Sequence, residues 1–254
     1  MKTYVIGIDA GSTMTKGVLW QEGMLATAME PTGWSPKQAV ETILGQWREA
    51  YQCKDEDIRL VATGYGRIAI SQAVKTVTEI TCHGQGARYL HPAVRTVIDI
   101  GGQDSKVIAL DAQGQVKDFM MNDKCAAGTG KFLQVTTAAL GEELSNLDQM
   151  IDKAEAIAIN SMCTVFAESE IIGLLAQNKP KSGILKGVLA SIAQKVKTMV
   201  AKVHLEEDVF FSGGLAQSQL IAKIFSETLE CQIYRSPLGV YTGAIGAALI
   251  GAKL

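Results

Sequence analysis

The sequence predicts an α/β protein built from two related halves with a cleft between them. Apolar strand-like segments alternate with helical segments along its 254 residues. An Asp-x-Gly-x-x-x-x-Lys string occurs twice, from Asp9 to Lys16 and from Asp99 to Lys106, at an offset of 90 residues. A repeat at the start of each half indicates duplication. Glycine is abundant, with 25 residues, many of them beside Asp, Ser or Thr in short polar turns.

Each half is expected to begin with a β-hairpin, because two apolar runs flank a polar turn at residues 4–20 and again at residues 96–110. Residues 181–183 are expected to form a loop between two helices. Further strands are predicted at residues 60–63, 116–120, 209–212 and 233–234. Helices are predicted at residues 35–51, 68–74, 130–140, 163–178, 186–204, 219–229 and 239–252.

Composition and charge exclude several classes of protein. The chain is 47% hydrophobic and 20% charged with five prolines, which fits neither a disordered chain nor a collagen-like fibre. Its formal net charge of −2 provides no excess of basic residues for a nucleic-acid backbone. Charged residues interrupt the longer apolar stretches, so we expect no signal peptide, no membrane span and a cytoplasmic location.

Three polar turns predict a phosphate site. The first, from Asp9 to Lys16, offers backbone N–H donors, hydroxyls, a carboxylate and an ammonium group, which together suit a phosphate and Mg²⁺. The second turn, at residues 99–104, adds two glycines and two carboxylates, and the third, at residues 211–216, follows a buried strand. Each turn alone could be an ordinary hairpin, but three in this order form a strong pattern. The sequence contains neither a Walker A string nor a dinucleotide-binding fingerprint.

Cysteine usage indicates reduced thiols or metal ligands instead of a disulfide framework. Cys125 and Cys163 each precede a predicted helix start, where the helix dipole favours a thiolate. A cubane iron–sulfur cluster takes four ligands, which a twofold dimer would supply from these two positions. Two ordinary buried cysteines remain the alternative at this point. Of the other three, Cys53 is expected at the surface, whereas Cys82 is assigned to packing and Cys231 to the core.

The order of the three turns resembles the superfamily of actin, sugar kinases and heat-shock 70 ATPases. This resemblance implies two duplicated actin-like (ribonuclease H-like) domains with a nucleotide cleft between them. It implies a first half at residues 1–95, closed by a C-terminal helix at residues 240–254, and a second half at residues 96–239 that carries the cluster cysteines. The small residues at 243–248 match the closing helix of such folds.

The chain is also similar to ATP-dependent activators of (R)-2-hydroxyacyl-CoA dehydratases. The matching strings lie at residues 7–13, 99–104, 125–133 and 163–170, in addition to the closing helix. These belong with the ATPase subunits of benzoyl-CoA reductase. The resemblance implies a homodimer that holds one [4Fe-4S] cluster through Cys125 and Cys163. It also implies ATP-driven transfer of one electron, from ferredoxin or flavodoxin, to a dehydratase or reductase partner.

The same resemblance assigns roles within a site for ATP or ADP with Mg²⁺. Asp9 and Asp99 orient the metal, and either Gln103 or Asp104 positions the attacking water. Lys16 offsets phosphate charge, and the roles of Glu168 and Glu170 stay open. The remaining nucleotide contacts are assigned to Gly11, Ser12, Thr13, Thr15, Gly101, Gly102 and Gln103 for the phosphates, and to Gly213 and Gly214 for adenosine. A sugar-type kinase and a non-redox regulatory ATPase are the alternatives. The kinase would leave the two cysteines without a function, and in the regulatory ATPase they would be structural.

Overall fold

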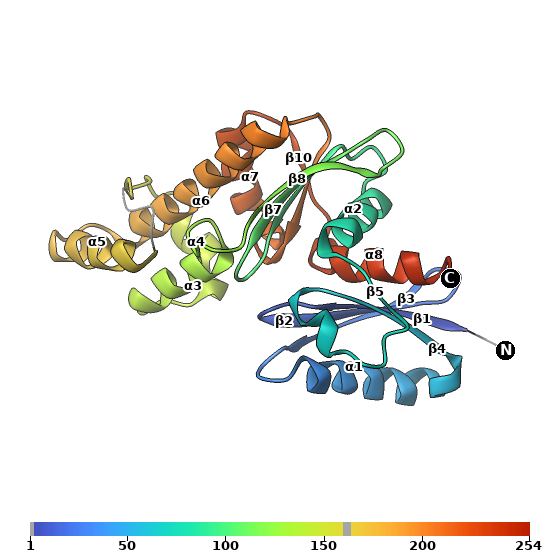
Figure 1. The fold of residues 1–254 in the computed structure, drawn as a ribbon. Helices are drawn as coiled ribbons and strands as arrows, with labels where there is room; N and C mark the ends of the chain where they lie inside the picture. The colour runs from blue at the N-terminus through green and yellow to red at the C-terminus, as the bar shows by residue number, and fades with distance from the viewer. Residues whose placement is uncertain (1–2, 160–163) are drawn as a thin grey trace.

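The computed structural model describes residues 3–159 and 164–254, and the strands of this part of the chain form two five-stranded sheets (Figure 1). The strand orders are β3-β2-β1-β4-β5 and β10-β9-β6-β7-β8. Each sheet combines an antiparallel meander with parallel neighbours, so both are mixed. The strands are β1 (Tyr4–Ala10), β2 (Met14–Trp20), β3 (Met24–Pro31), β4 (Ile58–Thr63), β5 (Lys75–Thr76), β6 (Thr96–Ile100), β7 (Ser105–Leu110), β8 (Val116–Asn122), β9 (Val209–Gly213) and β10 (Ile233–Tyr234).

Helices cover both faces of each sheet. They are α1 (Pro36–Tyr51), α2 (Glu79–Leu90), α3 (Gly130–Ala139), α4 (Leu147–Ile151), α5 (Thr164–Ala176), α6 (Lys181–Val203), α7 (Gln219–Leu229) and α8 (Thr242–Gly251). Across residues 3–159 and 164–254, none of these helices has the length and apolar character needed to cross a membrane.

The two predicted hairpins share one register. In the first, Asp9 of β1 lies opposite Lys16 of β2, and in the second, Asp99 of β6 lies opposite Lys106 of β7. The strand that follows in each sheet pairs in parallel, β4 with β1 and β9 with β6. The repeat in the sequence therefore corresponds to a repeat in topology, and the predicted class of two related α/β domains is confirmed.

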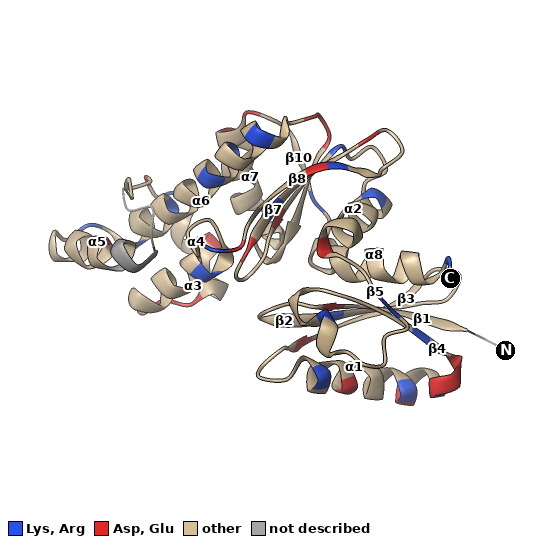
Figure 2. Ribbon diagram, in the orientation of Figure 1, with Lys and Arg blue, Asp and Glu red and all other residues tan. Residues whose placement is uncertain are grey.

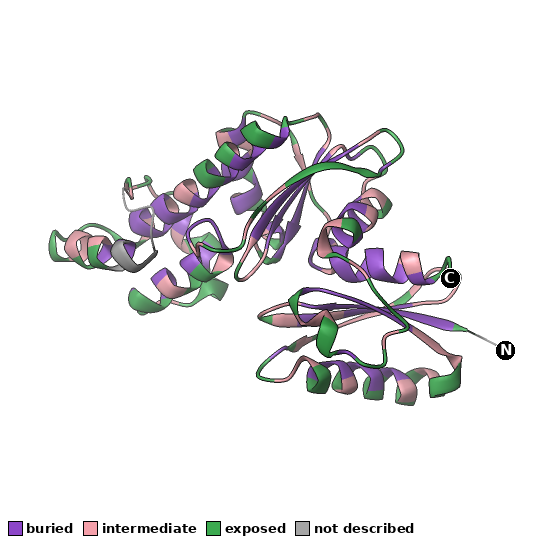
Figure 3. Ribbon diagram, in the orientation of Figure 1, coloured by how far each residue is buried: buried purple, intermediate pink, exposed green. Residues whose placement is uncertain are grey.

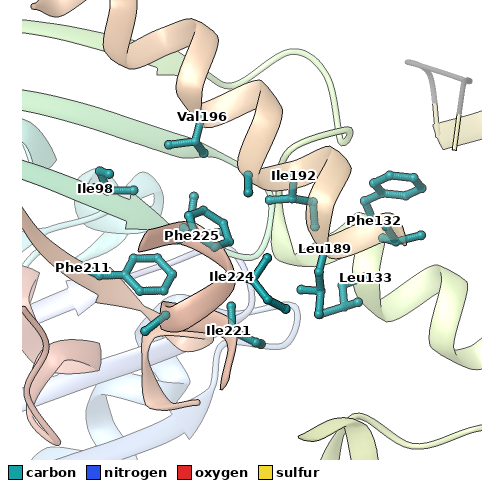
Figure 4. Packing of buried hydrophobic residues seen from close by; sticks show 14 of the residues in the cluster. Ile98, Phe132, Leu133, Leu189, Ile192, Val196, Phe211, Ile221, Ile224 and Phe225 are labelled. Carbon is teal, nitrogen blue, oxygen red and sulfur yellow. The ribbon is translucent and has the colours of Figure 1, made fainter. Parts of the chain in front are cut away.

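Each domain has its own apolar core. In the first, the apolar side of α1 packs on β1, with Ile43 and Trp47 buried beside Ile8. In the second, α6 and α7 cover one face of the sheet, and the rings of Phe211 and Phe225 stack with centroids 4.9 Å apart (Figure 4). The central strands of both sheets are buried along their length (Figure 3).

Helices α2 and α8 join the two domains by packing against each other (Figure 1). Helix α2 lies on the second sheet, against β6, β7 and β8, whereas α8 lies on the first, against β1, β2 and β4. Their contact depends on glycine. A Cβ at Gly86 would overlap the carbonyl oxygen of Thr242, and a Cβ at Gly246 would overlap that of Cys82. Gly7 likewise admits the backbone of α8 to β1, because a Cβ there would overlap the Ala244 oxygen.

Two of the predicted elements are wrong. The helix predicted at 68–74 is a short 3-10 turn, η2 (Tyr65–Ala69), followed by irregular chain and β5. Ile68 and Val74 are exposed and face no core, so the apolar pattern there does not reflect a buried helix face. Residues 181–183 are not a loop, because α6 begins at Lys181. Gly183 serves close packing there, since a Cβ would lie 2.8 Å from the Glu155 oxygen.

Helix α2 and strand β3 were not predicted from the sequence. Gly84 and Gly86 are typical of turns, yet they lie inside α2 and permit its close packing. The expectation for Cys53 is wrong as well, because its thiol is buried beside Trp47 and donates a hydrogen bond to the carbonyl oxygen of that residue. Cys82 is fully buried on α2, and Cys231 packs against the second core, as expected.

Substituting Gly246 by alanine tests the packing of α2 against α8. We expect the free energy of unfolding to fall by about 1–3 kcal/mol or more, because the new methyl group must displace backbone. The matched control is Gly45→Ala on exposed α1, where no described atom lies within 4 Å of the added methyl group. That variant should gain about 0.5–1 kcal/mol. Urea unfolding measures both, and equal midpoints would contradict the packing argument.

Candidate functional site

The turns of the two hairpins face each other. A Cβ at Gly102 in the second turn would overlap the hydroxyl oxygen of Thr13 in the first turn. The second turn is closed by a hydrogen bond of 2.9 Å from the Gly101 N–H to the Asp104 carbonyl oxygen. The structure therefore brings together two predicted phosphate turns that are about 90 residues apart in the chain.

Asp9 lies at the end of β1 and is 4% exposed. Three segments approach its carboxylate. Lys16 Nζ lies 3.7 Å from Oδ2, and a Cβ at Gly64 would lie 2.6 Å from Oδ1. A Cβ at Gly243, in the first turn of α8, would lie 2.8 Å from Oδ2. Only small residues at these two positions leave room for the carboxylate.

Asp99 occupies the equivalent position in β6 and is 3% exposed. The Ser212 hydroxyl donates a hydrogen bond of 2.7 Å to Oδ1, and Lys106 Nζ lies 3.5 Å from Oδ2. Burial raises the pKa of this carboxyl, but His83 in its protonated form, the Lys106 ammonium and the Ser212 hydrogen bond lower it below its usual range. The carboxylate is therefore ionised at neutral pH, as a metal ligand must be.

The two lysines of the repeat have different surroundings. Lys106 is 2% exposed, with Nζ 2.6 Å from Asp104 Oδ2 and 3.0 Å from Glu79 Oε2, in addition to the contact with Asp99. Burial opposes its charge, yet these carboxylates raise its pKa above the ordinary value. The side chain of Lys16 is 19% exposed and faces the first turn. Lys16 is thus placed to reach a phosphate, whereas Lys106 holds the second turn.

Of the remaining residues of the two turns, one is buried and supports the first turn, and the others are partly or fully exposed at the site. The Thr15 hydroxyl lies 3.0 Å from the Thr32 hydroxyl, which donates a hydrogen bond of 2.7 Å to the Gly11 carbonyl oxygen. Thr15 therefore supports the first turn from behind. Ser12 is partly exposed, and Thr13 and Gln103 are exposed.

The third turn lies beside the second. Gly213 at the end of β9 pairs with Ile100, and its φ of 89° with a Cβ that would overlap the Ile100 oxygen requires glycine. Gly214 begins a 3-10 turn, η4 (Gly214–Gln217), and no described atom lies within 4 Å of its Cβ position. Gly214 therefore leaves space for a ligand beside the second turn.

The loop that carries Cys125 is bonded to the second turn. At the start of α3, the N–H of Gly130 donates to the Gly101 oxygen at 2.9 Å, and that of Lys131 donates to the Gly102 oxygen at 2.7 Å. At the other end of the loop, the Asn122 amide donates to the Cys125 oxygen at 2.8 Å. The glycine turn and the partly exposed Cys125 thus belong to one hydrogen-bonded unit.

Cys163, the second predicted cluster ligand, lies outside the described residues, directly before α5. Glu168 and Glu170 lie on α5. Within the described ranges, 3–159 and 164–254, no three His, Cys, Asp or Glu side chains gather closely enough to hold a metal ion.

The roles of three residues of the site could not be predicted from the sequence. Glu79 and His83 are four residues apart, but the sequence has no His-Glu-x-x-His string to indicate a metal site, and the two share a helix face only because they lie on α2. Lys106 was visible through the repeat, but its burial among carboxylates was not.

Two equivalent α/β domains with facing glycine turns and buried carboxylates are the architecture of a two-domain nucleotide-binding protein. A ROK family glucokinase from Streptomyces griseus, solved with glucose and AMPPNP, shares this fold, with a TM-score of 0.60 at 14% identity. The coverage is 99% of this chain and 100% of that chain. At that identity, the likeness shows the fold alone.

The chain belongs to the BadF/BadG/BcrA/BcrD ATPase family, whose model matches residues 6–251. It is 42% identical over 253 residues to the activator of lactoyl-CoA dehydratase from Anaerotignum propionicum, covering 97% of this chain and 96% of the relative. Component A of (R)-2-hydroxyglutaryl-CoA dehydratase from Acidaminococcus fermentans superposes with a TM-score of 0.93 at 39% identity, over 99% and 98% of the two chains.

The activator of 2-hydroxyisocaproyl-CoA dehydratase from Clostridium difficile, solved with bound ADPNP, has a TM-score of 0.92 at 36% identity. The superposition covers 99% of this chain and 95% of that structure. The family and these relatives confirm the predicted resemblance and the predicted ATPase class.

Replacing Lys106 with methionine should lower the free energy of unfolding by about 3–5 kcal/mol, because three carboxylates lose their buried counter-charge. Lys16→Met is the matched variant in the first hairpin. Its longer, more exposed ion pair should cost about 1 kcal/mol or less. Denaturant titration of the two variants tests the difference, and equal losses would contradict the assigned roles of the two lysines.

Proposed function

We propose that the chain is an ATP-hydrolysing activator that transfers single low-potential electrons to a partner 2-hydroxyacyl-CoA dehydratase or a related cluster enzyme. The observation that carries this proposal is the pair of hydrogen bonds from the start of α3 to the carbonyl oxygens of Gly101 and Gly102. A movement of the second turn in response to nucleotide must be passed to the loop that carries Cys125.

The nucleotide site takes ATP or ADP with Mg²⁺ between the two hairpin turns. The turns at Gly11–Thr13 and Gly101–Gln103 hold the phosphates through backbone N–H groups. In the second turn these are the N–H groups of Gly102 and Gln103, because that of Gly101 donates to the Asp104 oxygen. Lys16 offsets the phosphate charge. Asp9 and Asp99 hold the metal and its waters, which fits two buried carboxylates of which Asp99 is kept ionised. The bound metal supplies neutralisation of phosphate charge. Gly213 and Gly214 border the adenosine. The ADPNP in the clostridial relative supports nucleotide binding.

Gln103 is the residue that positions the attacking water. The alternative, Asp104, is engaged by Lys106 at 2.6 Å, and a Cβ at Gly101 would lie 2.5 Å from its Oδ1. Asp104 therefore braces the second turn. Gln103 is exposed at the tip of the same turn, and its amide can both accept and donate a hydrogen bond.

The cluster belongs between two copies of the chain. Cys125 and Cys163 from each protomer supply four thiolates to one [4Fe-4S] cluster, and a partly exposed thiol on a hydrogen-bonded loop suits a site shared between subunits. When bound, the cluster supplies a one-electron carrier. Ferredoxin or flavodoxin is the donor. The proposed first domain comprises residues 1–95 and 240–254, so by chain position it includes α2, although that helix lies on the second sheet.

Nucleotide can drive this protein only through differential affinity. ATP must bind one arrangement of the two domains more tightly than ADP does, because equal affinity for both arrangements shifts neither. The turns that face each other come from different domains, so a γ-phosphate between them meets groups from both. The same contact makes the domain angle sensitive to hydrolysis.

Asp9→Ala should reduce ATP hydrolysis by at least about a hundredfold, since positioning of metal and water contributes several kcal/mol to transition-state stabilisation. Asp99→Ala should behave alike. Asp152→Ala, an exposed carboxylate at the end of α4, is the control and should keep full turnover. Phosphate release from purified protein measures all three. Unchanged turnover in both site variants would mean that the turns have only a structural role.

Cys125→Ser should abolish iron retention, and so should Cys163→Ser. The wild-type dimer should contain about four iron atoms under anaerobic conditions, by the ligand count of a cubane cluster. Ser substitutions at Cys53, Cys82 and Cys231 are the matched controls, since these thiols lie in packing positions. Full iron content in Cys125→Ser would exclude the bridging cluster. Circular dichroism shows whether each variant is folded, so that loss of iron in a folded control variant also contradicts the assignment of the ligands.

A further inference from the structure

His83 on α2 lies between the two carboxylates that face the nucleotide site. Its side chain is 6% exposed, and Nδ1 is 3.4 Å from Asp99 Oδ1 in the second domain. On the other side, Nε2 lies 3.1 Å from the Cβ position of Gly243, and Asp9 Oδ2 lies 2.8 Å from the same point. The imidazole therefore connects Asp99 of one domain with the surroundings of Asp9 in the other.

The Nδ1 atom is buried and has no hydrogen-bond partner among the described residues. Its contact with Asp99 Oδ1 has the distance of an ion pair but not the geometry of a hydrogen bond. That oxygen already accepts the hydrogen bond from Ser212, and Asp99 Oδ2 faces Lys106. A buried polar atom without a partner is costly, and in native proteins it commonly marks a place where water or a ligand binds.

We propose that His83 is a positioning residue of the nucleotide site, and that Nδ1 obtains its hydrogen-bond partner from a water molecule of the hydrated divalent cation held by Asp9 and Asp99. The inference rests on the proposed function in that it requires a cation–nucleotide complex at these carboxylates.

The chemistry of magnesium favours a bridging water over direct ligation. Mg²⁺ prefers oxygen ligands and usually keeps several waters when a protein binds it. A metal-bound water donates hydrogen bonds, so Nδ1 accepts and the imidazole proton lies on Nε2, toward the side of Asp9. In this tautomer Nδ1 and Asp99 Oδ1 are both acceptors, so no hydrogen bond forms between them at 3.4 Å and Nδ1 requires a separate donor.

The hydrogen bond between His83 and the metal-bound water would also affect the packing of α2. Helix α2 packs on the second sheet and on α8, and Cys82, next to His83, touches Gly246 of α8 directly. A cation complex that fixes the imidazole therefore fixes α2 against the first turn of α8. His83 thus links the occupancy of the site to the helix contact on which the domain angle depends.

The wild-type protein offers a direct spectroscopic test, because the chain has three histidines. In protein labelled with ¹⁵N-histidine, addition of magnesium and ADPNP should shift the Nδ1 resonance of His83, and addition of ADPNP with EDTA should not. His91 is the internal control. It pairs with Asp208 at 3.5 Å and stacks on Tyr234, with ring centroids 4.2 Å apart, so its resonances should not move.

Substitutions separate positioning from folding. His83→Leu should weaken binding of magnesium ADPNP about tenfold or more and leave binding of metal-free ADPNP unchanged, in line with loss of a hydrogen bond in a charged site. His83→Asn places an amide close to the position of Nδ1 and should retain most of the affinity. His91→Asn should match the wild type. An equal loss with and without magnesium would indicate a structural role and overturn the proposal.

Different outcomes would overturn the role of His83 and the proposed function. If the wild type binds magnesium ADPNP but the His83 resonance stays in place, the role of His83 is overturned and the proposed function stands. If equilibrium dialysis detects no binding of ADPNP to the wild type, the proposed function is overturned, and the role of His83 with it.

Discussion

The close approach of the α2 and α8 backbones determines how the two domains are placed relative to each other. Each helix lies on the sheet of one domain, and Gly86 and Gly246 let their backbones meet. Because Gly7 also admits α8 to β1, the first sheet, α8, α2 and the second sheet form one continuous stack. This stack brings Asp9 and Asp99 to one place and sets Gly102 against Thr13. A small change in the helix contact must alter the distance between the hairpin turns, because each turn is fixed to its own sheet.

A second connection runs from the turns toward Cys125. The carbonyl oxygens of Gly101 and Gly102 accept the first N–H groups of α3, so the turn fulfils the role that a capping side chain has in other helices. Lys106 holds that turn from beneath through Asp104 and Asp99. The second turn is thus held by a buried lysine, whereas Lys16 beside the first turn is more exposed. Over the molecule as a whole, acidic and basic residues occur on both domains (Figure 2).

The sequence predicted local features well and long-range contacts poorly. Both hairpins could be predicted because strand, turn and strand follow one another directly, and the shared string fixed their equivalence. Helix α2 could not, because Gly84 and Gly86 are helix-breaking residues by local propensity and gain their purpose only from α8. The roles of Lys106 and His83 depend on residues brought together by folding. Cys53 shows the same limit, since its charged neighbours along the chain lie outside while its thiol points inward against Trp47.

If the nucleotide turns and the Cys125 loop move as one unit, bound nucleotide must change the accessibility of the cluster. The measurement is the rate at which an external iron chelator removes iron from the reduced dimer under argon, with magnesium ADPNP, with magnesium ADP and without nucleotide. We expect faster removal with ADPNP than with ADP, and a smaller difference in Lys16→Ala, which loses a phosphate contact but no cluster ligand. Identical rates in all three states, with nucleotide shown to be bound, would contradict the coupling of the two sites.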